Sequence, residues 1–391
     1  MVKVKSWLFT EVRGKVKKAE FRRRKNKVTE LSQKRIPFNP RTPAQQEVRK
    51  TYGKCVEEWN KLSESEKRQW RIIGTLQGIS GYNAFMRECI SERLGKIWYE
   101  ITIDNSDNSN DLTDYQVLLE IVNDSTFFED CKNEQKYLEF YDTDKSTLLN
   151  HFVEEFDTTN KNAKIWIKVP SIPANATKTI YLKINTSRTT DLSNPYNVFD
   201  FYDDFENLEN WDTHTSLGNV SISNSILILD GDADASGGIN GVRSKSTFSK
   251  PLIIEFKLKI TAPTSNYAWK QFGIGDTDLS KAYLNGGNNL ILRNQETDKI
   301  YFMCKKDGNE TTVNVDSITS WHIESIYWGD VAKNLWDYEP KAEISTNVPT
   351  IQLYIMIGVG NNAGENAIEC DWVRTRKYTE PEPTVSYAKM S

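Results

Sequence analysis

The chain has 391 residues, of which 38% are hydrophobic, and a net charge of −4, so it can hold two or three domains with apolar cores. The longest apolar run, IQLYIMIGVG at 351–360, is about half of a membrane span, which argues against a transmembrane helix. The charged N-terminus has no apolar segment and no cleavage site, so we expect neither a signal peptide nor membrane insertion.

Charge is unevenly distributed along the chain. Residues 1–96 contain 24 lysines and arginines against 10 acidic residues, a net charge of +14, and the remainder contains 26 against 44, a net charge of −18. The division falls where a helical pattern gives way to alternating strands. We therefore predict a domain boundary near residue 96, with residues 1–96 as an anchoring module.

The first 36 residues form a basic segment with 13 lysines and arginines against 3 glutamates. Apolar and charged residues alternate in AEFRRRKNKVTEL at 19–31, which predicts a β-hairpin turning at Lys25 and Asn26. Such an arm suits a polyanion, either an acidic protein surface or nucleic acid, and a solvated terminus is the alternative. The residues expected to contact this partner are Arg22, Arg23, Arg24, Lys25 and Lys27.

Three short helices are expected between residues 42 and 94. The segments TPAQ at 42–45 and SESE at 63–66 each match a capping box, and apolar residues then recur at steps of three or four. Cys55 and Cys89 fall on the apolar faces, so we expect packed thiols there. The scattered cysteines favour assembly in the cytoplasm over a disulfide scaffold.

The basic hairpin, NPRTPAQQ at 39–46 and GISGYNAF at 78–85 follow one another in a specific order. This order resembles a module found in structural proteins of tailed bacterial and archaeal viruses. The resemblance covers about residues 11–95. It implies that the chain is a virion component, and it carries over no catalytic residue.

Residues 97–198 have the pattern of a β-sandwich. In AKIWIKV at 163–169 and TIYLKI at 179–184 every second residue is apolar, so each strand has one buried face. The acidic loop at 104–114 lacks the glycine and the terminal glutamate of an EF-hand, so we expect a solvated loop. The segment resembles a family of unknown function found in microbial surface proteins and archaeal virus proteins, which implies a spacer or binding module.

The last large segment, residues 199–380, also alternates, as in LIIEFKLKI at 252–260. FDFYDDF at 199–205 and IECDWVRTRKY at 368–378 are similar to the entry and closing strands of a concanavalin-like, laminin-G-like jelly roll. These two strands are therefore expected to pair. The predicted fold is multidomain and mainly β: a basic hairpin with a small helical bundle, a β-sandwich, and a jelly-roll sandwich.

Residues 381–391 contain two prolines, so we expect an extended tail that could reach a neighbouring subunit.

The resemblance to jelly rolls implies carbohydrate binding, in which sugar rings stack on flat aromatic side chains beside polar groups. Packing of each aromatic ring on its own sheet is the alternative. If the first and last strands pair, Asp203 and Asp371 could share a calcium ion, and salt-bridged or capping carboxylates are the alternative. The candidate glycan-binding residues are Tyr267, Trp269, Trp328, Trp336 and Tyr338.

We expect no enzymatic activity. A jelly-roll glycosidase needs two carboxylates across a cleft, and the usual Glu-x-Asp strand signature followed by a second glutamate is missing from the sequence. The three histidines, His151, His214 and His322, have no spacing that suits a triad or a metal site.

Together these features predict a virion surface protein that is assembled in the host cytoplasm, as a capsid decoration protein, head fibre or tail component. Its basic module would dock onto other virion proteins, its two β-domains would project, and the jelly roll would offer a site for host glycans. A homo-oligomer is expected. The alternatives are a cell-surface adhesin unrelated to a virion, which should carry a secretion signal, and a protein that binds nucleic acid through the basic arm.

Overall fold

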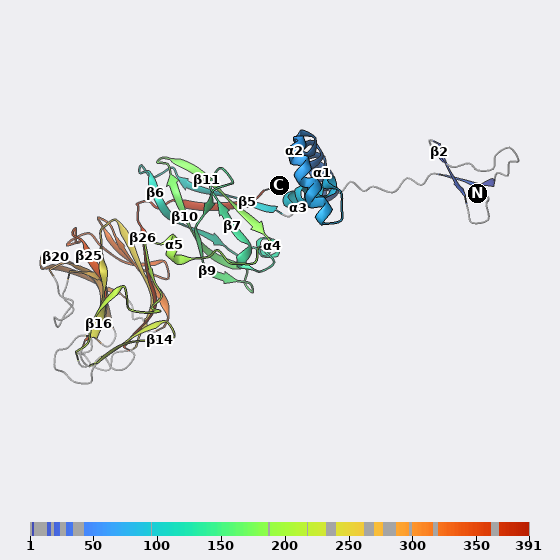
Figure 1. The fold of residues 1–391 in the computed structure, drawn as a ribbon. Helices are drawn as coiled ribbons and strands as arrows, with labels where there is room; N and C mark the ends of the chain where they lie inside the picture. Colours follow the sequence, from blue (N-terminus) through green and yellow to red (C-terminus); the bar gives the residue numbers. More distant parts are fainter. Residues whose placement is uncertain are drawn as a thin grey trace. The chain divides into compact units, whose positions relative to one another are not determined.

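The computed structural model describes residues 2–3, 14–16, 19–23, 29–33, 43–94, 96–186, 188–216, 218–231, 240–261, 270–276, 287–296, 299–315, 320–360 and 367–390. The chain divides into two compact units, residues 1–94 and 95–391, and each is described by itself (Figure 1). No described helix is both long enough and apolar enough to cross a membrane.

The first unit begins with a small antiparallel sheet in the order β1-β4-β3-β2. Ala19 pairs with Gln33 and Arg23 with Thr29, which confirms the predicted hairpin. The predicted turn, with Arg24, Lys25 and Lys27, lies outside the described residues, and the side chains of Arg22 and Arg23 are not described. The strands are β1 (Val2–Lys3), β2 (Gly14–Val16), β3 (Ala19–Arg23) and β4 (Thr29–Gln33).

Three helices follow, α1 (Pro43–Lys61), α2 (Glu64–Leu76) and α3 (Gly81–Leu94). Ser63 and Glu66 form the predicted capping box at the start of α2. A Cβ atom on Gly74 would lie 2.7 Å from the backbone nitrogen of Gly81, so the two helices touch backbone to backbone. This contact explains why the GISG segment needs glycine at its second glycine position.

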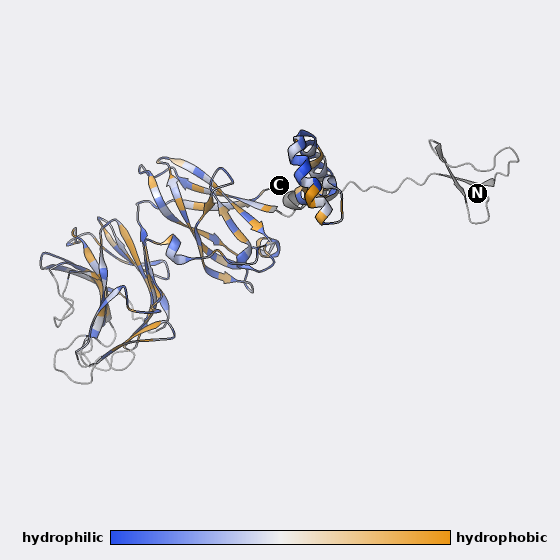
Figure 2. Ribbon diagram, in the orientation of Figure 1, coloured by the Kyte–Doolittle hydropathy of each residue, from blue (hydrophilic) through white to orange (hydrophobic). Residues whose placement is uncertain are grey.

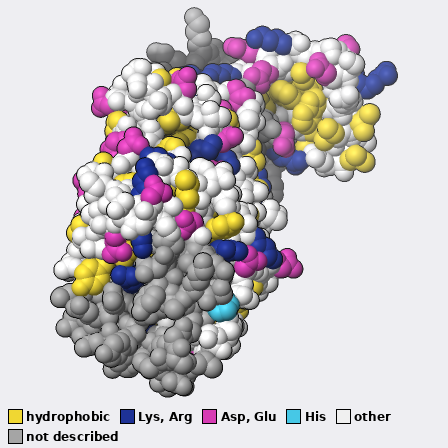
Figure 3. All heavy atoms as spheres, turned by 90° about the vertical axis from the view of Figure 1, so that its left-hand side faces the viewer, with side chains coloured by type: hydrophobic (Ala, Val, Ile, Leu, Met, Phe, Trp, Pro, Cys, Tyr) yellow, Lys and Arg dark blue, Asp and Glu magenta, His cyan; other side chains and the backbone are white. Residues whose placement is uncertain are grey.

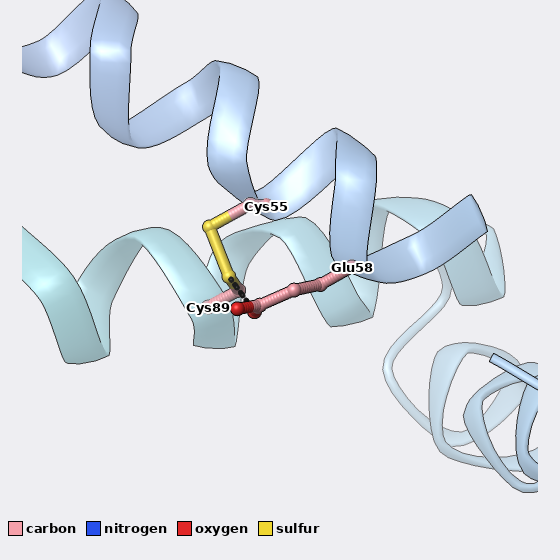
Figure 4. Close-up of a disulfide and its surroundings, with 3 residues drawn as sticks. All are labelled: Cys55, Glu58 and Cys89. Atoms are coloured by element: carbon pink, nitrogen blue, oxygen red, sulfur yellow. Dashed lines mark hydrogen bonds between the residues drawn. A yellow bond between two sulfur atoms is a disulfide. The ribbon is translucent and has the colours of Figure 1, made fainter. Parts of the chain in front are cut away.

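The prediction of two packed thiols in the bundle was wrong, because Cys55 of α1 and Cys89 of α3 form a disulfide (Figure 4). Both sulfurs are buried beside Phe85 and Met86, so the apolar faces were placed correctly and only the bond was missed. The carboxylate of Glu58 lies 3.6 Å from the Cys89 sulfur. Because a disulfide sulfur has no proton to donate, we treat this as a contact and not as a hydrogen bond.

The second unit contains two sandwiches. In the first, a sheet in the order β27-β5-β11-β7-β8 faces a sheet in the order β6-β10-β9. Their apolar faces form one core, which includes Ile165, Ile167 and Val169 as predicted. The elements are β5 (Lys96–Asn105), β6 (Leu112–Ile121), α4 (Ser125–Asp130), β7 (Leu138–Tyr141), β8 (Leu148–Leu149), β9 (His151–Asp157), β10 (Asn162–Ile172), β11 (Ala176–Asn185), α5 (Pro195–Val198) and β27 (Thr384–Lys389).

The C-terminal tail is extended, as predicted, but it pairs within its own chain instead of reaching a neighbouring subunit. It forms β27, which pairs antiparallel with β5 from Thr384 opposite Asp104 to Lys389 opposite Tyr99. Tyr387 packs on Tyr99 and donates to Asp124 at 2.9 Å. The chain therefore leaves the first sandwich, builds the second, and returns to close an edge of the first.

The second sandwich is the expected jelly roll, with sheets in the orders β14-β15-β26-β17-β22-β23-β24 plus β12, and β13-β16-β25-β18-β19-β20-β21. The strands are β12 (Phe201–Asp203), β13 (Trp211–His214), β14 (Asn219–Ser223), β15 (Ile226–Asp230), β16 (Asn240–Phe248), β17 (Leu252–Ile260), β18 (Lys270–Gly275), β19 (Asn289–Glu296), β20 (Lys299–Lys306), β21 (Asn309–Val315), β22 (His322–Trp328), β23 (Ala332–Trp336), β24 (Glu339–Ile344), β25 (Leu353–Val359) and β26 (Ile368–Lys377).

Alternation of apolar and polar residues builds the jelly-roll core, as Figure 2 shows along the strands. Ile254, Phe256 and Leu258 of β17 face Phe272 and Ile274 of β18 in the interior. The entry and closing strands pair as expected, with Asp203 opposite Val373. The predicted fold class is confirmed.

Candidate functional site

The two sheets of the jelly roll have outward faces of different kinds. The outward face of the sheet that contains β17 and β26 packs against the first sandwich, through Trp166, Val198 and Phe199. We call this contact the junction. Gln116 of β6 adds hydrogen bonds at the junction. Its amide donates to the Val198 carbonyl and accepts from the Lys377 backbone N–H, each at 3.0 Å.

Five charged side chains meet in the junction, of which Glu255, Arg374 and Arg376 are buried, and we call them the junction cluster: Glu154, Glu255, Arg374, Arg376 and Glu382. Arg374 donates to Glu255 at 2.5 Å and lies 2.9 Å from Glu154 of the first sandwich. Arg376 donates to Glu255 at 3.2 Å and to Glu382 at 2.5 Å. Burial alone would raise the pKa of Glu255, but the two guanidinium groups outweigh it and hold that pKa below its usual value.

Tyr338, a predicted glycan-binding residue, belongs to the junction. Its hydroxyl donates to Glu154 at 2.9 Å and accepts from Arg374 at 3.0 Å. Burial raises the pKa of Tyr338 well above its ordinary value, so the phenol stays protonated. This side chain links the two sandwiches and does not face an open site.

The other predicted aromatic residues are dispersed. Trp328 is fully buried in the core and donates to the Pro349 carbonyl at 2.9 Å, so it cannot stack on a sugar. Trp336 packs edge-on against His322 and lies under Lys341, which is the sheet-packing alternative. Tyr267 and Trp269 lie outside the described residues.

The calcium prediction is not supported, because Asp203 and Asp371 face different surroundings. Asp203 is buried and accepts hydrogen bonds from the backbone of Phe205 and from the side chains of Asn210 and Trp211. A β-bulge between β17 and β26 carries Asp371, which pairs with Lys257 at 2.9 Å. Among the described residues no cluster of three or more His, Cys, Asp or Glu side chains could hold a metal ion.

The opposite sheet, from β13 to β21, has a side that points away from the jelly-roll core, which we call the outer face, although Ile291, Met303 and Met356 on it are fully buried. Alternation places Arg243, Met356, Ile291 and Met303 in one row across it, and Gln271 and Arg293 in a second row. In the second row Gly241 and Gly358 contribute no side chain. The Arg243 guanidinium lies 4.5 Å from the Tyr354 ring centroid and donates to Asp212 at 3.0 Å, which sets an aromatic ring beside polar groups.

Gln271 is the most unusual side chain of the outer face. It is fully buried, yet neither its amide nitrogen nor its amide oxygen has a hydrogen-bond partner. A buried amide without partners costs about 1–3 kcal/mol of stability. One buried donor and one buried acceptor therefore lie without a partner in this row of the sheet. No sequence pattern singled out Gln271, because its signal is a missing partner.

A groove with a volume of about 790 Å³ lies at the rim of the junction. Its charged side chains already pair with each other, Lys250 with Asp330 at 2.7 Å and Lys333 with Glu380 at 2.6 Å. In this respect the groove differs from the outer face, where the amide of Gln271 has no partner.

A family described as a domain of unknown function, DUF2341, matches residues 134–214, which span β7 to β11 of the first sandwich and β12 and β13 of the jelly roll. The comparison with curated proteins gave no match.

Solved structures similar to this chain include an endo-β-1,3-glucanase from Pyrococcus furiosus, at 15% identity and a TM-score of 0.37, covering 50% of this chain and 95% of that one. A Bacillus licheniformis β-glucanase has 19% identity and a TM-score of 0.36, covering 46% and 98%. A β-agarase A in complex with oligoagarose has 12% identity and a TM-score of 0.33, covering 44% and 83%.

Proposed function

We propose that this chain is a non-enzymatic surface protein of a virus particle, which attaches through its first unit and displays its jelly roll to bind host glycans. The observation that carries the proposal is the contrast between the two faces of the jelly roll. One is fixed to the first sandwich by the junction cluster, and the other holds polar side chains that include the unpartnered amide of Gln271.

The junction supports a role in display, because it joins the two sandwiches into one arm. Arg374 reaches Glu255 of its own domain and Glu154 of the first sandwich, and β27 closes the first sandwich after the jelly roll is complete. Two sandwiches joined in this way hold the jelly roll at one position relative to the first sandwich. The net charge of +14 in residues 1–96 suits attachment to an acidic surface.

The position of the carboxylates on the outer face supports binding without hydrolysis. Among the described side chains of this face, Asp212 lies on β13 and Glu310 on β21, the two edge strands of a seven-stranded sheet. Six steps of about 4.8 Å put these strands ~29 Å apart, whereas a glycosidase places its two carboxylates about 5–10 Å apart.

A glycan array probed with the full chain tests the binding function. We expect binding to a restricted set of oligosaccharides, and we expect Gln271→Leu to weaken that binding about tenfold or more, because an amide that has no hydrogen-bond partner within the described residues is lost. Full affinity of the Gln271→Leu variant would show that glycans bind elsewhere. Failure of the unmodified chain to bind any glycan would remove the binding part of the proposal.

A further inference from the structure

The helical bundle of the first unit exposes an apolar face. In α2 only Gly74 is buried, and α2 contacts α3 through this glycine and through Trp70, which packs on Phe85. Ile72 is 58% exposed and Leu76 is 84% exposed, and Ile73 is 36% exposed. Large exposed apolar side chains on one helix mark a contact surface when they lie together.

Helical geometry places these three side chains together. Each residue is rotated by ~100° from the one before, so Ile72, Leu76 and Ile73 fall within one arc of about 100°. Trp70 and Gly74, which face the bundle, lie on a different side of the helix. The exposed arc is therefore a second apolar face of α2, which the bundle does not use.

Helix α1 also has exposed apolar side chains, beside α3. Val48 and Tyr52 are each 47% exposed, although they continue the stripe that buries Cys55. The Tyr52 hydroxyl lies 3.4 Å from that of Tyr82, which places it beside the first turn of α3. Figure 3 shows hydrophobic side chains gathered on the helical bundle, at the upper right of the view. We call Val48, Tyr52, Ile72, Ile73 and Leu76 the docking face.

We propose that the docking face binds an acidic protein surface of the particle, an inference that rests on the proposed function and names its attachment site. Net charge distinguishes the two possible ligands of this face, a second copy of the chain and an acidic protein. Of the net charge of +14 in residues 1–96, residues 1–42 supply +11 and the helices at 43–94 supply only +2, so the basic segment that precedes the helices repels a second copy and attracts an acidic partner. Arg68 stands one helical turn before Ile72, so a basic group borders the apolar arc.

The test uses the full chain, produced together with the other particle proteins. A photo-crosslinking amino acid at position 76 should join the chain to one particle protein, through a peptide that is rich in Asp and Glu. The variant Leu76→Asp should lower incorporation into particles about tenfold or more, because it removes a buried leucine from the contact and adds a charge repelled by the partner. Val122→Asp is the matched control, since Val122 is a 73% exposed apolar residue of the first sandwich and should incorporate normally.

Circular dichroism and disulfide content should be unchanged in Leu76→Asp, because the side chain is already exposed. Crosslinks to a second copy, or to residues 95–391 of the same chain, would contradict the inference. So would binding of the unmodified chain to phosphatidylglycerol vesicles that Leu76→Asp abolishes while incorporation is normal. If the unmodified chain is absent from particles, the proposed function fails; if it is present and Leu76→Asp incorporates normally, only the docking face fails.

Discussion

The junction and the outer face lie on opposite sides of the same jelly roll. They differ in whether their buried polar side chains have partners. In the junction Arg374, Arg376 and Glu255 are enclosed, and each is paired with an opposite charge. On the outer face Gln271 is equally buried and its amide has no partner. The comparison shows that buried charges stabilise the contact between the sandwiches where partners are supplied, and that a buried amide without a partner lowers stability.

The largest effect is expected from breaking the junction. Arg374→Ala leaves Glu255 and Glu154 without their shared guanidinium, and removal of one partner from a buried ion pair costs about 3–5 kcal/mol. Urea unfolding followed by circular dichroism should show this loss. Arg243→Ala is the matched change on the outer face, and because its partner Asp212 is 46% exposed the cost should stay below ~1 kcal/mol. Equal losses in the two variants would remove the contrast between the faces.

A smaller effect, dependent on pH, is expected from His151, which is buried and unpartnered but packs on Phe140 inside the first sandwich. Burial lowers the pKa of His151 to about 4, and nearby Asp191 and Arg188 act in opposite directions. Because the folded state disfavours the charged ring, stability is present above pH ~6.5 and is lost as the pH falls toward 4. The loss should reach about 2 kcal/mol by pH 5.

His151→Leu should remove most of this loss between pH 7.5 and pH 5, measured as the shift in the urea midpoint. Glu139, whose pKa is held at about 2 because its hydrogen bonds to Asn185, Arg188 and Lys183 outweigh burial, titrates below this window. An unchanged pH profile in the variant would show that His151 is not the group responsible.

The smallest effect is expected from removing the unpartnered amide of the outer face. Gln271→Leu replaces an unpartnered buried amide by an apolar side chain of similar size, so stability should rise by about 1–2 kcal/mol while glycan binding falls. Thermal unfolding of both proteins measures the change. A loss of stability in the variant would mean that the amide is structural.

Much of the fold could be predicted from the sequence, because alternation specifies a buried strand face directly. Ile254, Phe256 and Leu258 of β17 face the core as expected, and the closing strand pairs with the entry strand. The capping box at Ser63 could be predicted equally well, because its two hydrogen bonds join residues only three positions apart.

The sites could not be predicted in the same way, because they depend on contacts far apart in the chain. Trp328 was expected on a sugar and lies in the core, since an aromatic residue looks the same in both roles. Predicting the Cys55–Cys89 bond would have required knowing how α1 packs on α3. Predicting the junction would have required knowing that Glu154 meets Arg374, 220 positions away in the sequence. The two arginines of RTRK at 374–377 are a sequence feature that could have suggested buried ion pairs in the closing strand.

The most direct test of the central claim is mass spectrometry of purified particles from the source culture, combined with a gold-labelled antibody against residues 199–391. The proposal predicts abundant chain in the particles and gold on their outer surface, which places the jelly roll and its outer face where a host glycan can reach it. Absence from the particles, with the chain found on cell envelopes, would contradict the proposal and favour an adhesin.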